Sequence, residues 1–193
     1  MGTSIYLVLD MENDLVHADG PNGKAAYGEQ ARARRIVEHT RLALDKARAA
    51  NVPIGFVRIG FSPDYRECPA NSPIFSNARK NGIFKLGEWG TEVHPDLGQQ
   101  PGDFDIVKHR VSPFHGTKLD LILRTRGIRR IYCSGISTNA VVQAALREGH
   151  DRDYEMVLLE DCCCALSTEE HESSVKSLQR FGKITTTAEV TFE

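Results

Sequence analysis

Apolar runs of strand length alternate with helical patterns along almost the whole chain, and this alternation limits the folds available to it. The runs cover residues 5–9, 54–59, 104–107, 131–133, 156–159 and, more weakly, 184–187. Helical patterns lie between them at about residues 29–49, 118–126, 138–148 and 168–181. Strands that are apolar on both faces are typical of a parallel sheet covered by helices on both sides. We therefore predict an α/β protein, a three-layer α/β/α sandwich with a mostly parallel, Rossmann-like sheet of about six strands.

A single domain is the simplest organisation for this chain, and we expect it to span residues 1–193. A chain of this size buries roughly 70% of its unfolded surface on folding. Its content of 40% hydrophobic and 26% charged residues, with a formal net charge of −2, is typical of a globular protein.

The composition does not favour a nucleic-acid or membrane partner. Four arginines cluster at Arg124, Arg126, Arg129 and Arg130, but this pattern favours the solvated end of a helix over a nucleic-acid surface. The longest apolar stretches have strand length, and no basic flank precedes an apolar core near the N-terminus. We therefore expect a cytoplasmic protein that binds neither nucleic acid nor membrane.

The five cysteines do not form the pattern of a disulfide framework. Cys162, Cys163 and Cys164 are consecutive. Because neighbouring residues on a strand point to opposite faces, these three side chains cannot share one packed environment. We interpret the cysteines as buried thiols in a reducing compartment.

Residues 61–102 form the main exception to the alternating pattern. This segment is rich in Pro, Gly, Asn and Ser and has only fragmentary periodicity. A stretch of this length inside one domain is usually functional, and we expect a lid over a site or an oligomer contact. Residues 20–28 are predicted to be a loop.

Polar groups follow three of the predicted strands. Asp10 comes after the first strand, Lys108 after the third, and a turn beginning at Gly135 after the fourth. In an open parallel sheet, ligands bind beyond the carboxyl ends of the strands. The sequence therefore predicts that these groups converge on one site.

Each charged residue also has a structural interpretation. Asp10 could cap the turn that follows it, and Lys108 could extend from the strand end into solvent. A lysine after a buried strand is uncommon unless it is paired, because burying a lone ammonium is costly. Burial would raise the pKa of the Asp10 carboxyl, and a nearby ammonium would lower it.

Three segments, DMEND at residues 10–14, VKHRVSPFHGT at 107–117 and GISTNAVV at 135–142, resemble motifs of the isochorismatase-like (cysteine hydrolase) superfamily. They occur in the order and on the elements that this family uses. The resemblance implies the same fold, Asp10 and Lys108 as catalytic residues, a small-molecule substrate and a homo-oligomer, either a dimer or a tetramer. Family members usually carry Gln at the position of Glu12.

Most members of that superfamily carry a nucleophilic cysteine at the position of Val141. The resemblance therefore identifies Val141 as a degenerate nucleophile position. Cys68 is the one thiol that could fold over the site, and a reactive thiol needs an electropositive, accessible setting that nothing near Cys68 promises.

The turn of residues 135–138 is expected to supply an oxyanion hole. The resemblance implies a non-proline cis peptide between Ile136 and Ser137. The backbone N–H groups of Ala140 and Val141 are expected to point into the pocket, because helix N-termini bind anions. An oxyanion hole made of backbone survives the loss of a cysteine side chain.

The resemblance favours a hydrolase that works without covalent catalysis. True isochorismatases also lack the cysteine and use the Asp/Lys pair to hydrolyse a vinyl ether. We therefore predict hydrolysis of a vinyl ether or a related C–O or C–N bond. Ser137 stands where family isochorismatases carry an aromatic residue, which disfavours isochorismate itself. Arg58 and Arg79 are candidates for binding a substrate carboxylate.

The alternative is a small-molecule binding or regulatory protein on a catalytically dead hydrolase scaffold, with Val141 as an apolar floor. Retention of both Asp10 and Lys108 favours the enzyme. Neither a metal nor another cofactor is expected. The nicotinamidase branch of the superfamily binds zinc through an Asp-x-His motif, whereas this chain has Arg58-Ile59-Gly60 there.

Overall fold

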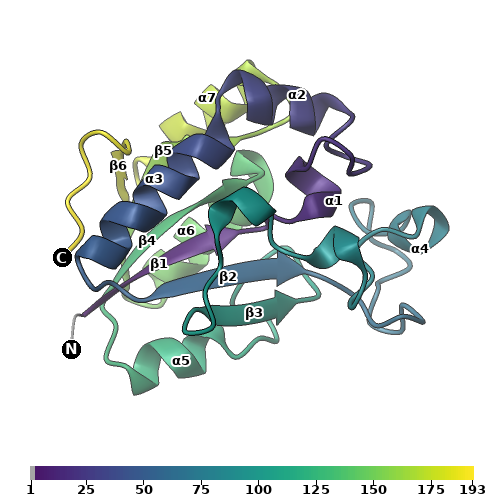
Figure 1. Ribbon diagram of the computed structural model, residues 1–193. Helices are drawn as coiled ribbons and strands as arrows, with labels where there is room; N and C mark the ends of the chain where they lie inside the picture. The colour runs from purple at the N-terminus through teal and green to yellow at the C-terminus, as the bar shows by residue number, and fades with distance from the viewer. Residues whose placement is uncertain (1–2) are drawn as a thin grey trace.

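The computed structural model describes residues 3–193 and shows a six-stranded sheet in the order β3-β2-β1-β4-β5-β6 (Figure 1). The strands are β1 (Ser4–Leu9), β2 (Ile54–Ile59), β3 (Phe104–Lys108), β4 (Arg130–Ile136), β5 (Glu155–Cys164) and β6 (Lys183–Thr185). All neighbouring pairs run parallel. The prediction of an α/β fold with a parallel sheet is confirmed.

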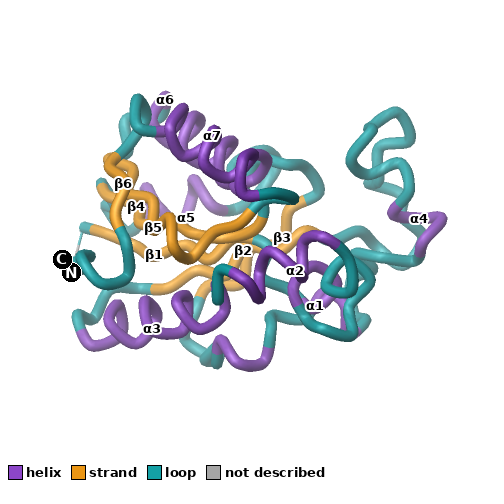
Figure 2. The backbone as a smooth tube through the Cα atoms, turned by 90° about the horizontal axis from the view of Figure 1, so that it is seen from above, coloured by secondary structure: helices purple, strands orange, loops and turns teal. Residues whose placement is uncertain are grey.

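Helices cover both faces of the sheet. They are α1 (Asn13–Val16), α2 (Ala26–Ala33), α3 (Ile36–Ala49), α4 (Ala78–Asn81), α5 (Leu119–Thr125), α6 (Gln143–Asp151) and α7 (Thr168–Leu178). Short turns are η1 (Trp89–Thr91), η2 (Pro95–Leu97) and the π-helical η3 (Thr138–Val142), which leads into α6. Figure 2 shows α3 on one side of the strands and α6 and α7 on the other. This arrangement is the predicted three-layer sandwich.

Strand β1 lies at the centre of the sheet because both its faces are apolar. Tyr6 and Val8 pack in the core beneath α3, whereas Ile5, Leu7 and Leu9 pack in the core shared with α5 and α6. Each side chain of this kind contributes about 1.5–3 kcal/mol when it is fully buried. The period of two along the strand therefore joins the three layers.

The same alternation separates the consecutive cysteines, which belong to β5 itself rather than to a segment after a shorter strand. Cys162 and Cys164 lie in the core cluster beneath α3, and Cys163 lies in the cluster on the opposite face. The expectation that these thiols occupy different environments is confirmed.

Two predictions for residues 20–49 were wrong. Residues 20–28 are not entirely loop, because α2 begins at Ala26. The helix predicted over residues 29–49 is broken at Arg35, which has a φ of 52°. Arg34 Nε donates to the Cys163 carbonyl oxygen at 2.8 Å, so the end of α2 is held against β5 before the chain turns into α3. A tertiary contact thus overrides a continuous helical pattern.

Residues 61–102 connect the carboxyl end of β2 to the amino end of β3. Figures 1 and 2 both show the part around α4 projecting from the end of the sheet. This part has a core of its own, in which Phe61, Tyr65, Phe75, Ala78 and Phe84 pack together with one residue of β2. Its compactness comes from these aromatic side chains rather than from regular secondary structure.

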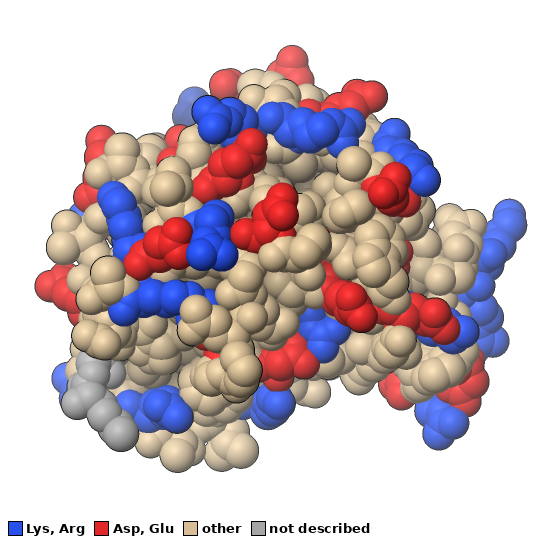
Figure 3. Space-filling view, in the orientation of Figure 1, with Lys and Arg blue, Asp and Glu red and all other residues tan. Residues whose placement is uncertain are grey.

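Charged side chains of both signs are interspersed over the face of the molecule drawn in Figure 3. Many of them form ion pairs, such as Arg48 with Asp103 at 2.7 Å. Within residues 3–193, no helix is both long enough and apolar enough to cross a membrane.

Candidate active site

Asp10 and Lys108 form a buried ion pair at the carboxyl edge of the sheet. Asp10 directly follows β1, and its φ of 55° turns the chain out of the strand. Lys108 is the last residue of β3. Lys108 Nζ lies 2.9 Å from Asp10 Oδ2, and the two side chains are 2% and 7% exposed. Each charge therefore offsets much of the desolvation cost of the other.

The ion pair leaves one acceptor unused. Lys108 Nζ also donates to the Arg110 carbonyl oxygen at 3.1 Å. Asp10 Oδ1 is buried and has no hydrogen-bond partner among the described residues. Burial raises the pKa of the Asp10 carboxyl, and the Lys108 ammonium opposes that rise. Asp10 is thus a carboxyl group with a raised pKa and a free oxygen.

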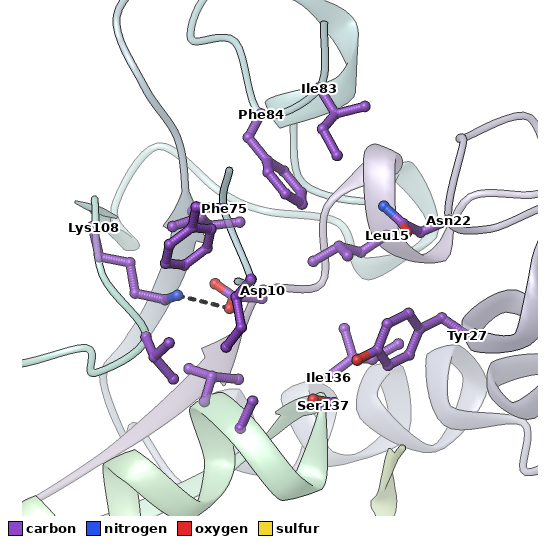
Figure 4. A pocket seen from close by; sticks show the side chains of 15 residues that line it. Asp10, Leu15, Asn22, Tyr27, Phe75, Ile83, Phe84, Lys108, Ile136 and Ser137 are labelled. Atoms are coloured by element: carbon purple, nitrogen blue, oxygen red, sulfur yellow. Dashed lines mark ion pairs between the residues drawn. The ribbon is translucent and has the colours of Figure 1, made fainter. Parts of the chain in front are cut away.

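A cavity of about 280 Å³ opens onto this pair (Figure 4). Asp10 and Lys108 line it together with Ile136, Ser137, Ala140 and Val141. The structure therefore brings all six sequence-predicted site residues to one cavity, from the ends of β1, β3 and β4.

Apolar side chains from residues 61–102 form much of the cavity wall. Ile74, Phe75, Ile83 and Phe84 line it from this segment. Figure 4 shows Ile83 and Phe84 on the opposite side of Asp10 from Ile136 and Ser137. The long segment therefore contributes side chains to the cavity wall.

Sequence patterns did not identify the lining residues near the N-terminus. Leu15, Asn22 and Tyr27 complete the wall on the side of α1 and α2. Tyr27 was missed because residues 20–28 had the composition of a loop. Neither Asn22 nor Tyr27 belongs to a motif that would mark it in the sequence as a site residue.

The turn after β4 has the predicted cis peptide, between Ile136 and Ser137. Gly135 is required there, because its φ is 147° and a Cβ would lie 2.0 Å from the Leu9 carbonyl oxygen. The expectation for the Ala140 amide needs a correction. Ala140 N–H donates to the Ser137 carbonyl oxygen at 3.2 Å, so it has a partner within the turn. This bond has the i→i−3 spacing of a 3₁₀ turn, whereas the bond from Val142 N–H to the same oxygen, at 3.2 Å, has the i→i−5 spacing of a π-helix.

A buried hydrogen-bond chain anchors the same turn to α7, and no sequence motif indicated it. Thr138 Oγ1 lies 2.8 Å from His171 Nδ1. His171 Nε2 lies 3.2 Å from Glu160 Oε2, and Glu160 pairs with Arg34 at 2.8 Å. The His171 contact lowers the pKa of Glu160. A lone histidine 33 residues from its hydroxyl partner gives no local signal in sequence.

Glu12 lies behind the ion pair rather than on the cavity surface. It is 0% exposed, and neither carboxyl oxygen has a hydrogen-bond partner among the described residues. Burial raises its pKa well above the ordinary value, and the Asp10 charge adds to that rise. The sequence marked Glu12 only as an unusual carboxylate.

The two arginines named as candidates for binding a substrate carboxylate have other partners. Arg58 binds Asp105 through two hydrogen bonds, of 2.7 Å and 2.6 Å. Arg79 donates to the backbone carbonyl oxygens of Asp64 and Tyr65. Neither arginine lines the cavity. This interpretation was wrong because the sequence shows the charge of an arginine but not the partners that hold its guanidinium group.

None of the cysteines, all of which are described, lines the cavity. Burial raises the pKa of Cys133, Cys162 and Cys164 to about 12, and that of Cys163 well above its ordinary value. The Cys68 thiol donates to the Phe75 carbonyl oxygen at 3.3 Å. Within residues 3–193, no three His, Cys, Asp or Glu side chains group as a metal site.

Residues 4–189 match the family model of the isochorismatase domain. The chain belongs to the isochorismatase family. A ureidoacrylate amidohydrolase, RutB, of Methylorubrum extorquens is 32% identical over 82% of this chain and 68% of its own length. The family protein YecD of Escherichia coli O157:H7 is 32% identical over 91% of this chain and 87% of its own length.

A solved structure has the same family fold. The cysteine hydrolase of Pseudomonas syringae superposes with a TM-score of 0.87 at 26% identity, covering 98% of this chain and 91% of that one. The chain is thus a hydrolase of the isochorismatase family by sequence and by fold.

Proposed function

We propose that this protein hydrolyses a C–O or C–N bond of a small organic substrate without a covalent enzyme intermediate. Asp10 transfers the proton, and Lys108 holds the charge of Asp10 and orients the substrate. The observation that carries this proposal is Asp10 Oδ1, a buried acceptor without a partner beside an ammonium in an otherwise largely apolar cavity. We propose that this carboxylate accepts a proton from a water molecule.

In the proposed reaction, a water O–H donates to Asp10 Oδ1. As the water oxygen bonds to the substrate carbon, its proton passes to Asp10. The C–N or C–O bond then breaks, and Asp10 returns the proton to the leaving nitrogen or oxygen. One water is consumed and the carboxylate is regenerated. A raised pKa assists both transfers, because a general acid-base works best when its pKa is close to the working pH.

We propose that the turn of residues 136–141 helps to stabilise the negative charge that develops on the substrate oxygen. Ser137 and Val141 lie at the start of the helical segment formed by η3 and α6, and both line the cavity. The first amides of a helix carry partial positive charge, which stabilises a developing oxyanion. Because the Ala140 amide has a partner in the turn, we assign this stabilisation to the helix end and the Lys108 ammonium together.

A covalent route through a cysteine thiol has no nucleophile here. We propose that Val141 occupies the position of the family nucleophile, and its side chain cannot attack a carbonyl. None of the cysteines lines the cavity. The relative RutB is named an amidohydrolase, which favours C–N bonds among the two substrate classes.

Turnover of amide and vinyl-ether panels tests the proposal. Asp10→Asn is expected to lower the hydrolysis rate about 10²–10⁴-fold, as for removal of a general acid-base. The same change at the exposed Asp19, Asp19→Asn, should leave the rate unchanged. Intact-mass spectra taken during turnover should show no substrate-derived adduct. A stoichiometric adduct would show that catalysis is covalent.

A binding or regulatory role is the second candidate, favoured by the apolar Val141 side chain, which is 2% exposed and packs into the core. In that case the wild-type protein binds ligands in the cavity but hydrolyses none of them. Asp10→Asn then changes the ligand affinity only. Hydrolysis by the wild type that depends on Asp10 excludes this role.

A further inference from the structure

The cavity combines a large apolar surface with few polar groups. Of the side chains that line it, Asp10 and Lys108 alone are charged, within the part of the chain that the structure describes. Asn22, Tyr27 and Ser137 are the neutral polar ones. A ligand inside is therefore surrounded mainly by aliphatic and aromatic groups, which favour apolar ligand surface.

The one cation in the cavity already has its counter-charge. Lys108 Nζ uses two of its three donors, one on Asp10 at 2.9 Å and one on the Arg110 carbonyl oxygen at 3.1 Å. It can still donate a hydrogen bond to a neutral ligand oxygen. Its charge, however, is balanced by Asp10, so an entering carboxylate gains little attraction from it.

Nearby cations do not replace it. Arg58 is held by Asp105, and Arg79 by two backbone carbonyl oxygens outside the cavity. Glu12 is a buried acidic group that does not line the cavity, and it lies within electrostatic range of both Asp10 and Lys108. A bound anion would therefore be buried without a partner of its own, which is costly.

The unused hydrogen-bonding group of the site is an acceptor, an oxygen of the Asp10 carboxylate. Asp10 Oδ1 is buried and without a partner among the described residues, and an anionic ligand oxygen would repel it. A ligand N–H or O–H would satisfy it. Both the charge and the hydrogen-bonding capacity of the cavity thus disfavour carboxylates.

We infer that the ligand of this cavity is an uncharged molecule with an apolar body and a polar end that carries both an N–H or O–H donor and an oxygen acceptor. The donor faces the Asp10 carboxylate, and the acceptor faces Lys108. This inference rests on the proposed function for the role of Asp10, and it names the substrate class of that site.

Two probes of equal shape and different charge test the inference. Benzamide is neutral, and benzoate is an anion at neutral pH. Calorimetric titration of the wild-type protein should give at least about tenfold tighter binding of benzamide, a difference of about 1.4 kcal/mol. Equal or tighter binding of benzoate would overturn the inference, and so would binding of neither probe.

A positive charge added at the cavity mouth tests whether the probes bind in this cavity. Ile74 lines the cavity and is 60% exposed, so Ile74→Lys adds an ammonium without burying it. This variant should bind benzoate at least about threefold more tightly than the wild type does, because the charges attract. Leu121 on α5 is 70% exposed and outside the cavity, and Leu121→Lys should leave both affinities unchanged. Equal effects of the two variants would contradict the assignment to this cavity.

The outcomes for ligand class and for reaction are separable. Selective benzamide binding without hydrolysis of any panel compound would keep the ligand class and reject the proposed reaction. Asp10-dependent hydrolysis combined with a preference for benzoate would do the reverse.

Discussion

Thr138 Oγ1 lies 2.8 Å from His171 Nδ1, and this buried hydrogen bond joins the cavity turn to α7. Both residues are buried, at 0% and 2% exposure. His171 continues to Glu160, which is fixed by Arg34. The position of Val141, three residues after Thr138, therefore depends on contacts outside the cavity.

Thr138→Val keeps the shape of the side chain and removes its hydroxyl. We expect the free energy of unfolding to fall by about 1–3 kcal/mol, because a buried histidine nitrogen loses its partner. Affinity for a cavity ligand should fall as well, since the turn is less firmly held. Urea unfolding and calorimetric titration measure the two effects.

The control for Thr138→Val is Ser174→Ala. Ser174 Oγ accepts a hydrogen bond from Gln143 Nε2 at 3.0 Å, which joins α6 to the same helix α7. Its removal should lower stability and leave ligand affinity unchanged. Equal losses of affinity in both variants would mean that the Thr138–His171 bond has no particular role in the site.

The buried ion pair should show strong non-additivity. Lys108→Met removes the partner of a buried carboxylate, and Asp10→Asn leaves a buried ammonium. We expect either change to cost about 3–5 kcal/mol of unfolding free energy. The double variant should cost less than the sum, because it leaves no unpaired charge. Additive losses in urea unfolding would show that the pair does not couple in solution.

Glu12→Gln should stabilise the protein at higher pH. The folded-state pKa of Glu12 is raised well above 4.5, mainly by burial. Its contribution to stability is therefore complete below pH 4.5 and is lost as the pH rises through the folded-state pKa. Glutamine does not ionise, so the Tm difference between the variant and the wild type should grow above pH 4.5 and then level off.

The matched change at an exposed site, Glu29→Gln on α2, controls for the loss of one negative charge. It should give a Tm difference that does not grow with pH in this way. A pH-independent difference for Glu12→Gln would show that the Glu12 carboxyl is solvated in solution.

Val141→Cys should create a reactive thiol. The new side chain would line the cavity near Lys108 at the start of a helical segment, a setting that lowers a thiol pKa below about 8.5. Native Cys133, by contrast, has a pKa raised to about 12 by burial. Iodoacetamide labelling followed by peptide mass spectrometry should find residue 141 modified faster than any native cysteine.

Lys108→Ala in the Val141→Cys background should slow that labelling, because the stabilising cation is lost. A labelling rate no faster than that of half-buried Cys68, and indifferent to Lys108, would contradict the hydrolase-like geometry.

The sequence predicts the sheet well because apolar runs of strand length are a local signal. Both faces of these strands pack against apolar cores. The sequence also places Asp10, Lys108 and the turn, since the ends of parallel strands meet at one edge. The break at Arg35 could not be predicted, because it depends on the contact of Arg34 with Cys163, far away in sequence. Local propensity is a weak guide where tertiary contacts compete with it.

Side-chain partners were the other missing information. Arg58 looked available for a substrate because sequence shows its charge but not the contact with Asp105. The Ala140 amide looked free because the sequence does not show its bond to the Ser137 carbonyl oxygen. Tyr27 lines the cavity and His171 binds Thr138 through contacts that only the fold creates.

The cavity wall is built from two parts of the structure. Asp10 and Lys108 stand at the end of the sheet, whereas Ile74, Phe75, Ile83 and Phe84 belong to residues 61–102, part of which packs in a small core with one residue of β2. Mutations in that segment can reshape the ligand space while the sheet keeps the ion pair at its 2.9 Å spacing. Evolution can therefore alter the substrate specificity of such a molecule while its ion pair stays the same. Engineering of a new specificity should begin at residues 74–84.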